Sequence, residues 1–131
     1  MILGLGSDIC SINRIEKVLN KFGDKFVQRW FGVKEQMELA KISDNKERFI
    51  ASLAKRFAAK EAFAKAMGTG FVKGTAWIDI EVVHHESGKP LLEISGRTEK
   101  TFKNLMPDAK VWVSLSDDYP WAQAVVIIES C

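Results

Sequence analysis

The sequence has little of several features that would assign it to a particular class of protein. Its 131 residues include only two cysteines, Cys10 and Cys131, which form neither a disulfide framework nor a metal-ligand cluster, so we expect two reduced thiols. No apolar run approaches the ~20 residues that span a bilayer. The N-terminal stretch MILGLGSD has no basic segment and no long apolar one. We therefore expect a cytoplasmic protein with no secretory signal and no membrane partner.

The excess of one sign of charge is also small, because 19 lysines and arginines are balanced by 17 aspartates and glutamates, for a net charge of +2. This balance is too small to indicate a nucleic-acid partner. Repeats, low-complexity tracts and linkers are missing. The 47% hydrophobic and 27% charged content is typical of a soluble globular protein, and the length predicts a single domain over residues 1–131.

The apolar periodicity alternates between strand-like and helix-like stretches. We expect a strand over 1–9 and a helix from Ser11 to Gly23, then short helical pieces at 24–31 and 34–42 and a long helix from about 45 to 67, ended by Gly68 and Gly70. Two hairpin units follow, 76–85 with 90–95 and 110–116 with 121–129, separated by a short helix over 97–106. The pattern predicts an α+β fold in which an antiparallel sheet packs on one long helix.

Glu61 is out of place in the long helix. At 100° per residue it shares a narrow arc with Leu53 and Phe57, on the side that should be buried. A buried carboxylate without a partner is costly, so Glu61 needs a cation or a metal ion. Lys65 lies one turn further on and could pair with it, which would be a purely structural arrangement.

Cations crowd this end of the helix beyond what one glutamate requires, namely Arg56, Lys60 and Lys65. A second unusual carboxylate, Asp8, follows the first predicted strand in GLGSDI. The glycines around it do not form G-x-G-x-x-G, so we exclude a dinucleotide site. Asp8 taken alone is typical of a turn. Two carboxylates near several lysines suit Mg²⁺ bound together with a phosphate substrate, because Mg²⁺ accepts one or two carboxylates and phosphate oxygens.

The first helix carries a basic stripe, formed by Arg14, Lys17, Lys21 and Lys25. Charges at such spacings are usually a solvated face. This stripe has almost no acids to balance it, so it is also a candidate surface for docking an acidic partner.

Four segments together resemble one known family. GLGSDICSINRI, KRFAAKEAFAKAMGTG, SGKP and VWVSLS with AQAVVIIE are similar, in order and over nearly the whole chain, to the bacterial holo-[acyl-carrier-protein] synthases, the small phosphopantetheinyl transferases. The resemblance implies transfer of 4′-phosphopantetheine from coenzyme A to a serine of apo acyl carrier protein, releasing adenosine 3′,5′-bisphosphate, in fatty acid biosynthesis. It also implies a homotrimer with active sites at the subunit interfaces.

The resemblance further assigns roles to individual residues. Asp8 and Glu61 would hold Mg²⁺ and, with Lys65, form the catalytic set; the basic stripe would dock the carrier protein. The residues expected to hold the coenzyme are Lys60, Lys65, the turn Gly88, Lys89 and Pro90, and with less support Arg56 and Ser116. For the general base that accepts the serine proton, Asp8 or a water held by it is favoured over Glu61.

One position departs from the family. After the SLS strand the family usually has a histidine beside the phosphates, whereas this sequence has Asp117. Either Asp117 points away, or the loop has shifted, or Asp117 binds a cation that restores the charge balance. A catalytically impaired relative that binds carrier protein or coenzyme A without transfer, or an unrelated metal-dependent phosphohydrolase, are the alternatives. His84 and His85 are expected at the surface, since successive strand residues face opposite ways and do not form a chelate.

Overall fold

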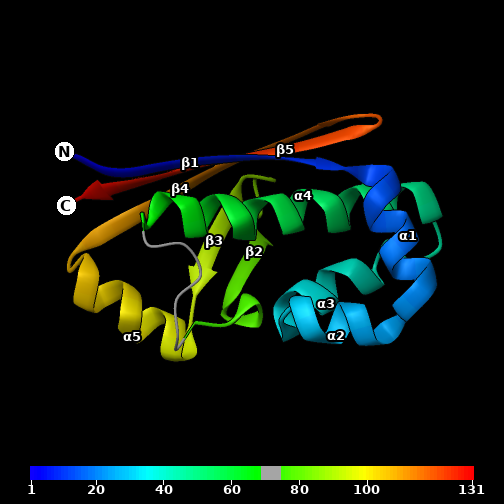
Figure 1. The fold of residues 1–131 in the computed structure, drawn as a ribbon, viewed down its shortest axis with the longest axis horizontal. Coiled ribbons are helices and arrows are strands. Elements are labelled where there is room, and N and C mark those ends of the chain that lie inside the picture. The colour runs from blue at the N-terminus through cyan, green and yellow to red at the C-terminus, as the bar shows by residue number, and fades with distance from the viewer. Residues whose placement is uncertain (69–74) are drawn as a thin grey trace.

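The computed structural model describes residues 1–68 and 75–131. Its elements, in chain order, are β1 (Ile2–Ser11), α1 (Ile12–Phe22), α2 (Asp24–Trp30), α3 (Val33–Ala40), α4 (Lys46–Ala66), the 3₁₀ turn η1 (Trp77–Asp79), β2 (Ile80–His84), β3 (Pro90–Ile94), α5 (Gly96–Leu105), β4 (Ala109–Asp118) and β5 (Trp121–Ser130) (Figure 1). The predicted elements are therefore present, with bounds shifted by a few residues. Gly70, predicted to help end the long helix, lies outside the described residues.

The strands form two antiparallel sheets rather than one. A three-stranded sheet has the order β1-β5-β4, and β2 pairs only with β3 in a second sheet. Figure 1 shows α4 running along the three-stranded sheet, with α1 at one end and α5 at the other. The predicted α+β architecture, an antiparallel sheet on a long helix, is confirmed, and the separation of the second hairpin is the difference.

Local sequence signals set the helix ends. Ser11 caps α1, since its hydroxyl accepts a hydrogen bond from the Arg14 backbone N–H at 3.2 Å, and the chain turns at Gly23 with φ +57°. Asn45 caps α4 in the same way, accepting from the Arg48 N–H at 3.1 Å. The elements that carry the candidate site residues thus begin where their capping residues predict.

Strand β1 and helix α4 approach each other closely at two glycines. A Cβ atom on Gly4 would lie 2.0 Å from the Ala66 carbonyl oxygen, and one on Gly6 would lie 2.0 Å from that of Ala62. Only glycine fits at such a backbone contact. Because side chains alternate along a strand, Asp8 follows on the same, helix-facing side. The glycines of GLGSD therefore serve helix–strand packing and place Asp8 against α4.

The opposite face of the three-stranded sheet is apolar and exposed. Leu5 is 65% exposed and Ile9 64% exposed on β1, and Trp112 on β4 and Trp121 on β5 are also exposed. Within the described residues, no helix has both the length and the apolar character needed to cross a membrane.

The free edge of β2 is bonded to helix side chains where a third strand would otherwise lie. Two carboxylates of α3 accept from its backbone. The Val82 N–H donates to Glu35 Oε2 at 3.2 Å, and the His84 N–H donates to Glu38 Oε2 at 2.9 Å.

Two cations of α4 donate to the carbonyls of the same edge. Lys60 Nζ donates to the Ile80 carbonyl, and Arg56 Nη1 donates to the Val82 carbonyl at 2.6 Å. Donors and acceptors thus alternate as they would along a neighbouring strand. We call Glu35, Glu38, Arg56 and Lys60 the edge quartet.

Candidate functional site

Asp8 lies on β1 facing the C-terminal half of α4. Its Oδ1 is 3.0 Å from Lys65 Nζ, and the same ammonium donates to the Ser7 carbonyl at 3.1 Å. The Asp8 side chain is 17% exposed, against 55% for Lys65. Two members of the predicted catalytic set therefore lie together, and the pair is open to solvent on the lysine side.

Glu61 is half-buried beside this pair. Burial raises the pKa of its carboxyl, and the nearby Asp8 charge raises it further, while Lys65 and Arg14 act in the opposite direction. The purely structural arrangement expected for Glu61, an ion pair with Lys65, is not formed among the described residues, because the Lys65 ammonium bonds Asp8. The two carboxylates therefore repel each other, and the nearby cations Lys65 and Arg14 offset this repulsion only in part.

This donor set fits a magnesium ion. Within the described residues no group of three His, Cys, Asp or Glu side chains could hold a metal. Asp8 and Glu61 supply two carboxylates from two rigid elements, the number that Mg²⁺ accepts while keeping water and phosphate oxygens as its other ligands. A divalent cation would also relieve the repulsion that raises the Glu61 pKa.

The field of the two carboxylates extends to a neighbouring thiol. Burial raises the pKa of Cys10 to about 11, and Asp8 and Glu61 contribute to the rise. Cys10 therefore stays protonated and unreactive. Both cysteines are free thiols, as the sequence predicts.

The surroundings of Lys60 differ from those that the sequence analysis expected. Its side chain is 0% exposed and its ammonium bonds Glu35, the Ile80 carbonyl and the Trp77 carbonyl. All three donor positions are used, so Lys60 has none left for a coenzyme. Burial lowers the pKa of Lys60, and the Glu35 charge opposes that shift. This geometry does not favour the predicted contact of Lys60 with a coenzyme, which stays a prediction, and it places Lys60 in the edge quartet.

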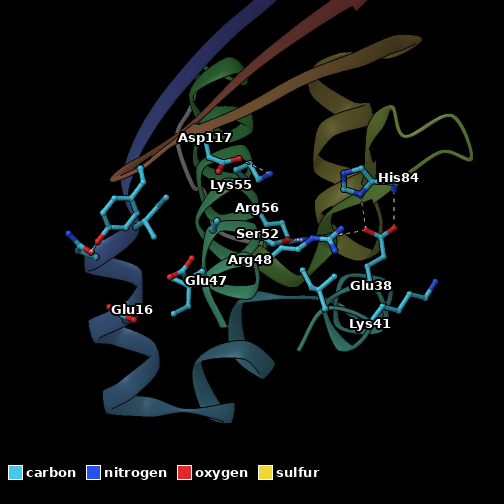
Figure 2. Close-up of a pocket in the computed structure, with 16 residues that line it drawn as sticks. Glu16, Glu38, Lys41, Glu47, Arg48, Ser52, Lys55, Arg56, His84 and Asp117 are labelled. Atoms are coloured by element: carbon cyan, nitrogen blue, oxygen red, sulfur yellow. Dashed lines mark hydrogen bonds and ion pairs between the residues drawn. The ribbon is translucent and has the colours of Figure 1, made fainter. Parts of the chain in front are cut away.

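A large pocket opens beside the N-terminal half of α4. It encloses about 1120 Å³ between α1, α3, α4 and the end of β4 (Figure 2). Its charged lining residues are Lys41, Arg48, Lys55 and Arg56 together with Glu16, Glu38, Glu47 and Asp117, and His84 joins them from β2. The sequence analysis missed Lys41, Arg48 and Lys55. A signal for two of them existed, since Arg48, Ser52 and Lys55 recur at four and three residues and so share one face of the helix.

Arg56 lines this pocket, but its guanidinium is already engaged. It donates to Ser52 Oγ at 3.1 Å, to the Val82 carbonyl at 2.6 Å and to Glu38 Oε1 at 2.7 Å. A contact between Arg56 and a coenzyme stays a prediction.

The acidic residue at the unusual position, Asp117, also lines the pocket. Its Oδ1 is 2.9 Å from Lys55 Nζ on α4. Of the three arrangements left open by the sequence, this geometry favours the one in which Asp117 binds a cation. The negative charge that departs from the family pattern is thus balanced within the chain.

The predicted coenzyme turn is only partly directed at the pocket. Gly88 and Pro90 line a smaller cavity of about 180 Å³ that shares Lys55, Arg56 and His84 with the larger one. Lys89 instead places its Nζ 4.9 Å from the centre of the Trp112 ring.

Ser116 is exposed and alternates with the helix-facing Leu115 along β4. It therefore belongs to the outer face of the sheet, away from α4. Its contact with the coenzyme stays a prediction.

The carboxylate pair and the pocket lie apart within one chain. Asp8 is on β1 and Asp117 on β4, the two opposite edges of the three-stranded sheet. None of Asp8, Glu61 and Lys65 lines the large pocket. The pocket also reaches Ile12 at the start of α1, which directly follows β1, so the two regions are separate but adjacent.

The basic stripe is solvent-exposed, as predicted. Arg14, Lys17 and Lys21 are exposed on α1, and Lys25 is exposed on α2, after the chain turns at Gly23. The stripe therefore spans two helices rather than one. Lys21 lies 5.3 Å from the ring centre of Phe22, which is 52% exposed.

Comparison with known proteins gives concordant results. Residues 4–124 match the model of the 4′-phosphopantetheinyl transferase superfamily. The holo-[acyl-carrier-protein] synthase of Bartonella quintana (strain Toulouse) is 46% identical over 99% of this chain and 97% of its own length. The crystal structure of that enzyme from Neisseria meningitidis has a TM-score of 0.89 at 35% identity, covering 99% of this chain and 100% of the other. A structure from Bacillus anthracis str. Ames, in complex with CoA (3′,5′-ADP), has a TM-score of 0.82 at 37% identity, covering 100% and 99%.

Proposed function

The chain belongs to the 4′-phosphopantetheinyl transferase superfamily, and we propose that it acts as a holo-[acyl-carrier-protein] synthase. In this reaction the serine hydroxyl of apo acyl carrier protein attacks the β-phosphorus of coenzyme A. The new bond is the phosphodiester to serine, and the bond that breaks releases adenosine 3′,5′-bisphosphate. The names of the similar proteins and the coenzyme complex of one of them support the donor and the acceptor.

The observation that carries the proposal is the Asp8–Glu61 carboxylate pair. It lies next to Lys65, on the two elements that the paired glycines bring together. These carboxylates would hold Mg²⁺, which when bound supplies positive charge to the diphosphate and its leaving group. Lys65 is exposed enough to turn from Asp8 to a phosphate oxygen.

The proton of the attacking serine needs an acceptor. Asp8, or a water bound to it, stays our predicted general base. Burial and the Asp8 charge raise the pKa of Glu61, but a carboxylate that binds Mg²⁺ loses this added basicity. Rates of Asp8→Asn and Glu61→Gln at saturating Mg²⁺ separate the two. Asp8→Asn should then remain the slower variant.

Coenzyme A is proposed to occupy the large pocket. The volume of about 1120 Å³ is at the upper end of ligand pockets, and both lysine and arginine side chains and acids line it. Among the described residues Lys41 and Arg48 make no ion pair, which leaves both able to meet phosphate charge. The acidic carrier protein is proposed to dock on the basic stripe, where the exposed Phe22 adds an apolar contact.

A homotrimer is proposed to complete the site. The exposed apolar face of the three-stranded sheet, with Leu5 and Ile9 at its edge, is a surface that a partner subunit would cover. The carboxylate pair and the pocket share no residue within one chain, so a neighbouring subunit could contribute to a site that uses either of them. Light scattering should give three times the mass of the chain, and Leu5→Asp should abolish both the trimer and the transfer.

Mass spectrometry of an apo acyl carrier protein, incubated with this protein, coenzyme A and Mg²⁺, tests the proposed reaction. The carrier should gain one phosphopantetheine group, and the gain should be lost in chelator and in Glu61→Gln. Glu99→Gln is the matched control, because Glu99 lies on α5 in a solvent-exposed pair with Lys103. Coenzyme binding without any gain would establish a binding-only relative, and phosphate released to water alone would establish a phosphohydrolase.

A further inference from the structure

Of the two histidines, His84 lines both cavities described above and His85 lines neither of them. The His84 side chain is 42% exposed. Its neighbour His85 faces the other way and hydrogen-bonds Ser87 within the turn, at 3.1 Å. The chain has two histidines in all, so the pair forms a natural comparison.

Glu38 fixes the orientation of His84 through two contacts. Glu38 Oε2 accepts from the His84 backbone N–H at 2.9 Å, and Glu38 Oε1 lies 2.9 Å from His84 Nδ1 (Figure 2). Although burial opposes it, hydrogen bonds from Arg56 and His84 lower the pKa of Glu38 to about 2. An ionised carboxylate only accepts, so Nδ1 carries the hydrogen, and Nε2 is the ring nitrogen left for a ligand.

Two cations of α4 lie near the ring, each paired with an acid, Arg56 with Glu38 and Lys55 with Asp117. Arg56 Nη2 shares Glu38 Oε1 at 2.7 Å and offsets the carboxylate charge. Lys55, which precedes Arg56 on α4, lines the same two cavities as His84. With both ring nitrogens protonated, His84 can donate Nδ1–H to Glu38 and Nε2–H to a phosphate oxygen at the same time.

We propose that His84, oriented by Glu38, is a phosphate-binding residue of the coenzyme pocket. The inference rests on the proposed function, which places coenzyme A there. It gives the pocket a donor on β2, on the wall opposite α1, that the motifs of the sequence did not indicate. Glu38 acts as a positioning residue, because it reaches the ligand only through the ring.

The two histidines allow a direct test in the unaltered protein. Coenzyme A is titrated into the full chain while the imidazole carbon-bound protons are followed by NMR, with His85→Gln used to assign the signals. The His84 signals should shift in proportion to occupancy while those of His85 stay in place. Bound coenzyme with no shift of the His84 signals would overturn the proposal.

Variants provide the second measurement. His84→Ala should raise the Kd of coenzyme A and its KM about tenfold, with kcat within about twofold, whereas His85→Ala should change neither. His84→Lys should recover part of the affinity by restoring a cation. Glu38→Gln should raise KM less than His84→Ala, without lowering kcat. Equal KM values for His84→Ala and the parent protein would overturn the proposal.

Dephospho-coenzyme A identifies which phosphate is bound. A tenfold effect of His84→Ala that disappears with this analogue assigns His84 to the 3′-phosphate, and one that persists assigns it to the diphosphate; both outcomes support the proposal. If the parent protein binds no coenzyme A, the proposed function fails along with this inference. If the parent protein binds coenzyme A and His84→Ala leaves the Kd unchanged, only this inference fails.

Discussion

Two consecutive residues of α4, Lys60 and Glu61, have opposite environments. Lys60 is fully enclosed, and each donor position of its ammonium is used by Glu35 or a backbone carbonyl. Glu61 is half-buried beside a like charge, and its pKa is raised by burial and by Asp8. One charge is balanced within the chain, and the other is left unbalanced.

The difference separates a structural charge from a functional one on the same helix. A buried charge with complete hydrogen bonding contributes to the fold, whereas a like-charge pair is tolerated where a ligand will neutralise it. Lysine and glutamate in a KE dipeptide look equivalent in sequence, but they point to different sides of α4 because consecutive helix residues are separated by 100°.

Removal of the enclosed Lys60 ammonium should have the largest effect, which is a loss of stability. Lys60→Met leaves Glu35 charged and buried and two carbonyls without donors, so we expect a loss of about 3–5 kcal/mol, or roughly 10–20 °C in melting temperature. Lys65→Met is the control, because that side chain is 55% exposed and should leave the melting temperature nearly unchanged. Equal melting temperatures for the two variants would break the comparison.

The double variant Lys60→Met with Glu35→Met sharpens the comparison between Lys60 and Glu61. Replacing both members of a buried ion pair by apolar residues is often neutral. Here the Val82 N–H and the Ile80 carbonyl would remain buried without partners, so we expect most of the stability loss to persist. Full recovery in urea unfolding would show that the edge quartet does not replace a strand.

Glu61→Gln should act on activity instead of stability. We expect the transfer rate to fall by about a hundredfold or more, because one of two metal-binding carboxylates is lost. The melting temperature in chelator should rise by a few degrees, since the repulsion from Asp8 is removed. A variant that is both inactive and unstable would place Glu61 with Lys60 as a structural residue.

Mg²⁺ should distinguish Glu61 from Glu35, the buried partner of Lys60, by a smaller change in melting temperature. A saturating excess of Mg²⁺ should raise the melting temperature of the parent protein by several degrees, corresponding to roughly 2–3 kcal/mol at a hundred times Kd. Glu61→Gln should lose this shift and Glu35→Gln should keep it. Calorimetric scans with and without Mg²⁺ measure both, and a shift retained in Glu61→Gln would contradict the metal site.

The smallest effect concerns pH, where two carboxylates should act in opposite directions. The lowered pKa of Glu38 adds stability that is present above the unfolded-state value of 4.5 and is lost as the pH falls towards about 2. The raised pKa of Glu61 costs stability as the pH rises above 4.5. Unfolding curves between pH 3 and 7 in chelator should be less acid-sensitive in Glu38→Gln and flatter above pH 4.5 in Glu61→Gln.

Local patterns predicted the elements well. Ser11, Gly23 and Asn45 act within a few residues of themselves, so their capping and turning roles are visible in sequence. The meeting of Asp8 with Lys65 was also predictable, but only from the family motifs, since 57 residues separate them.

The partners of other residues could not be read from the chain. Lys60 was assigned to the coenzyme because its buried partner, Glu35, lies 25 residues away on a helix that carries no motif. The pocket was missed because its wall combines α1, α3, α4 and the end of β4, and only the Arg48–Ser52–Lys55 face has a local spacing. Helical periodicity places a side chain on a face without showing what covers that face.

The edge quartet also bears on how chains of this protein meet one another. An open strand edge invites backbone pairing with a second chain, and Ile80–His84 has the β-branched composition that favours such addition. Side chains of α3 and α4 already occupy the donors and acceptors of that edge. The β2 edge is thereby closed to strand addition and to the aggregation that begins with it, whereas the apolar face of the first sheet stays open to association.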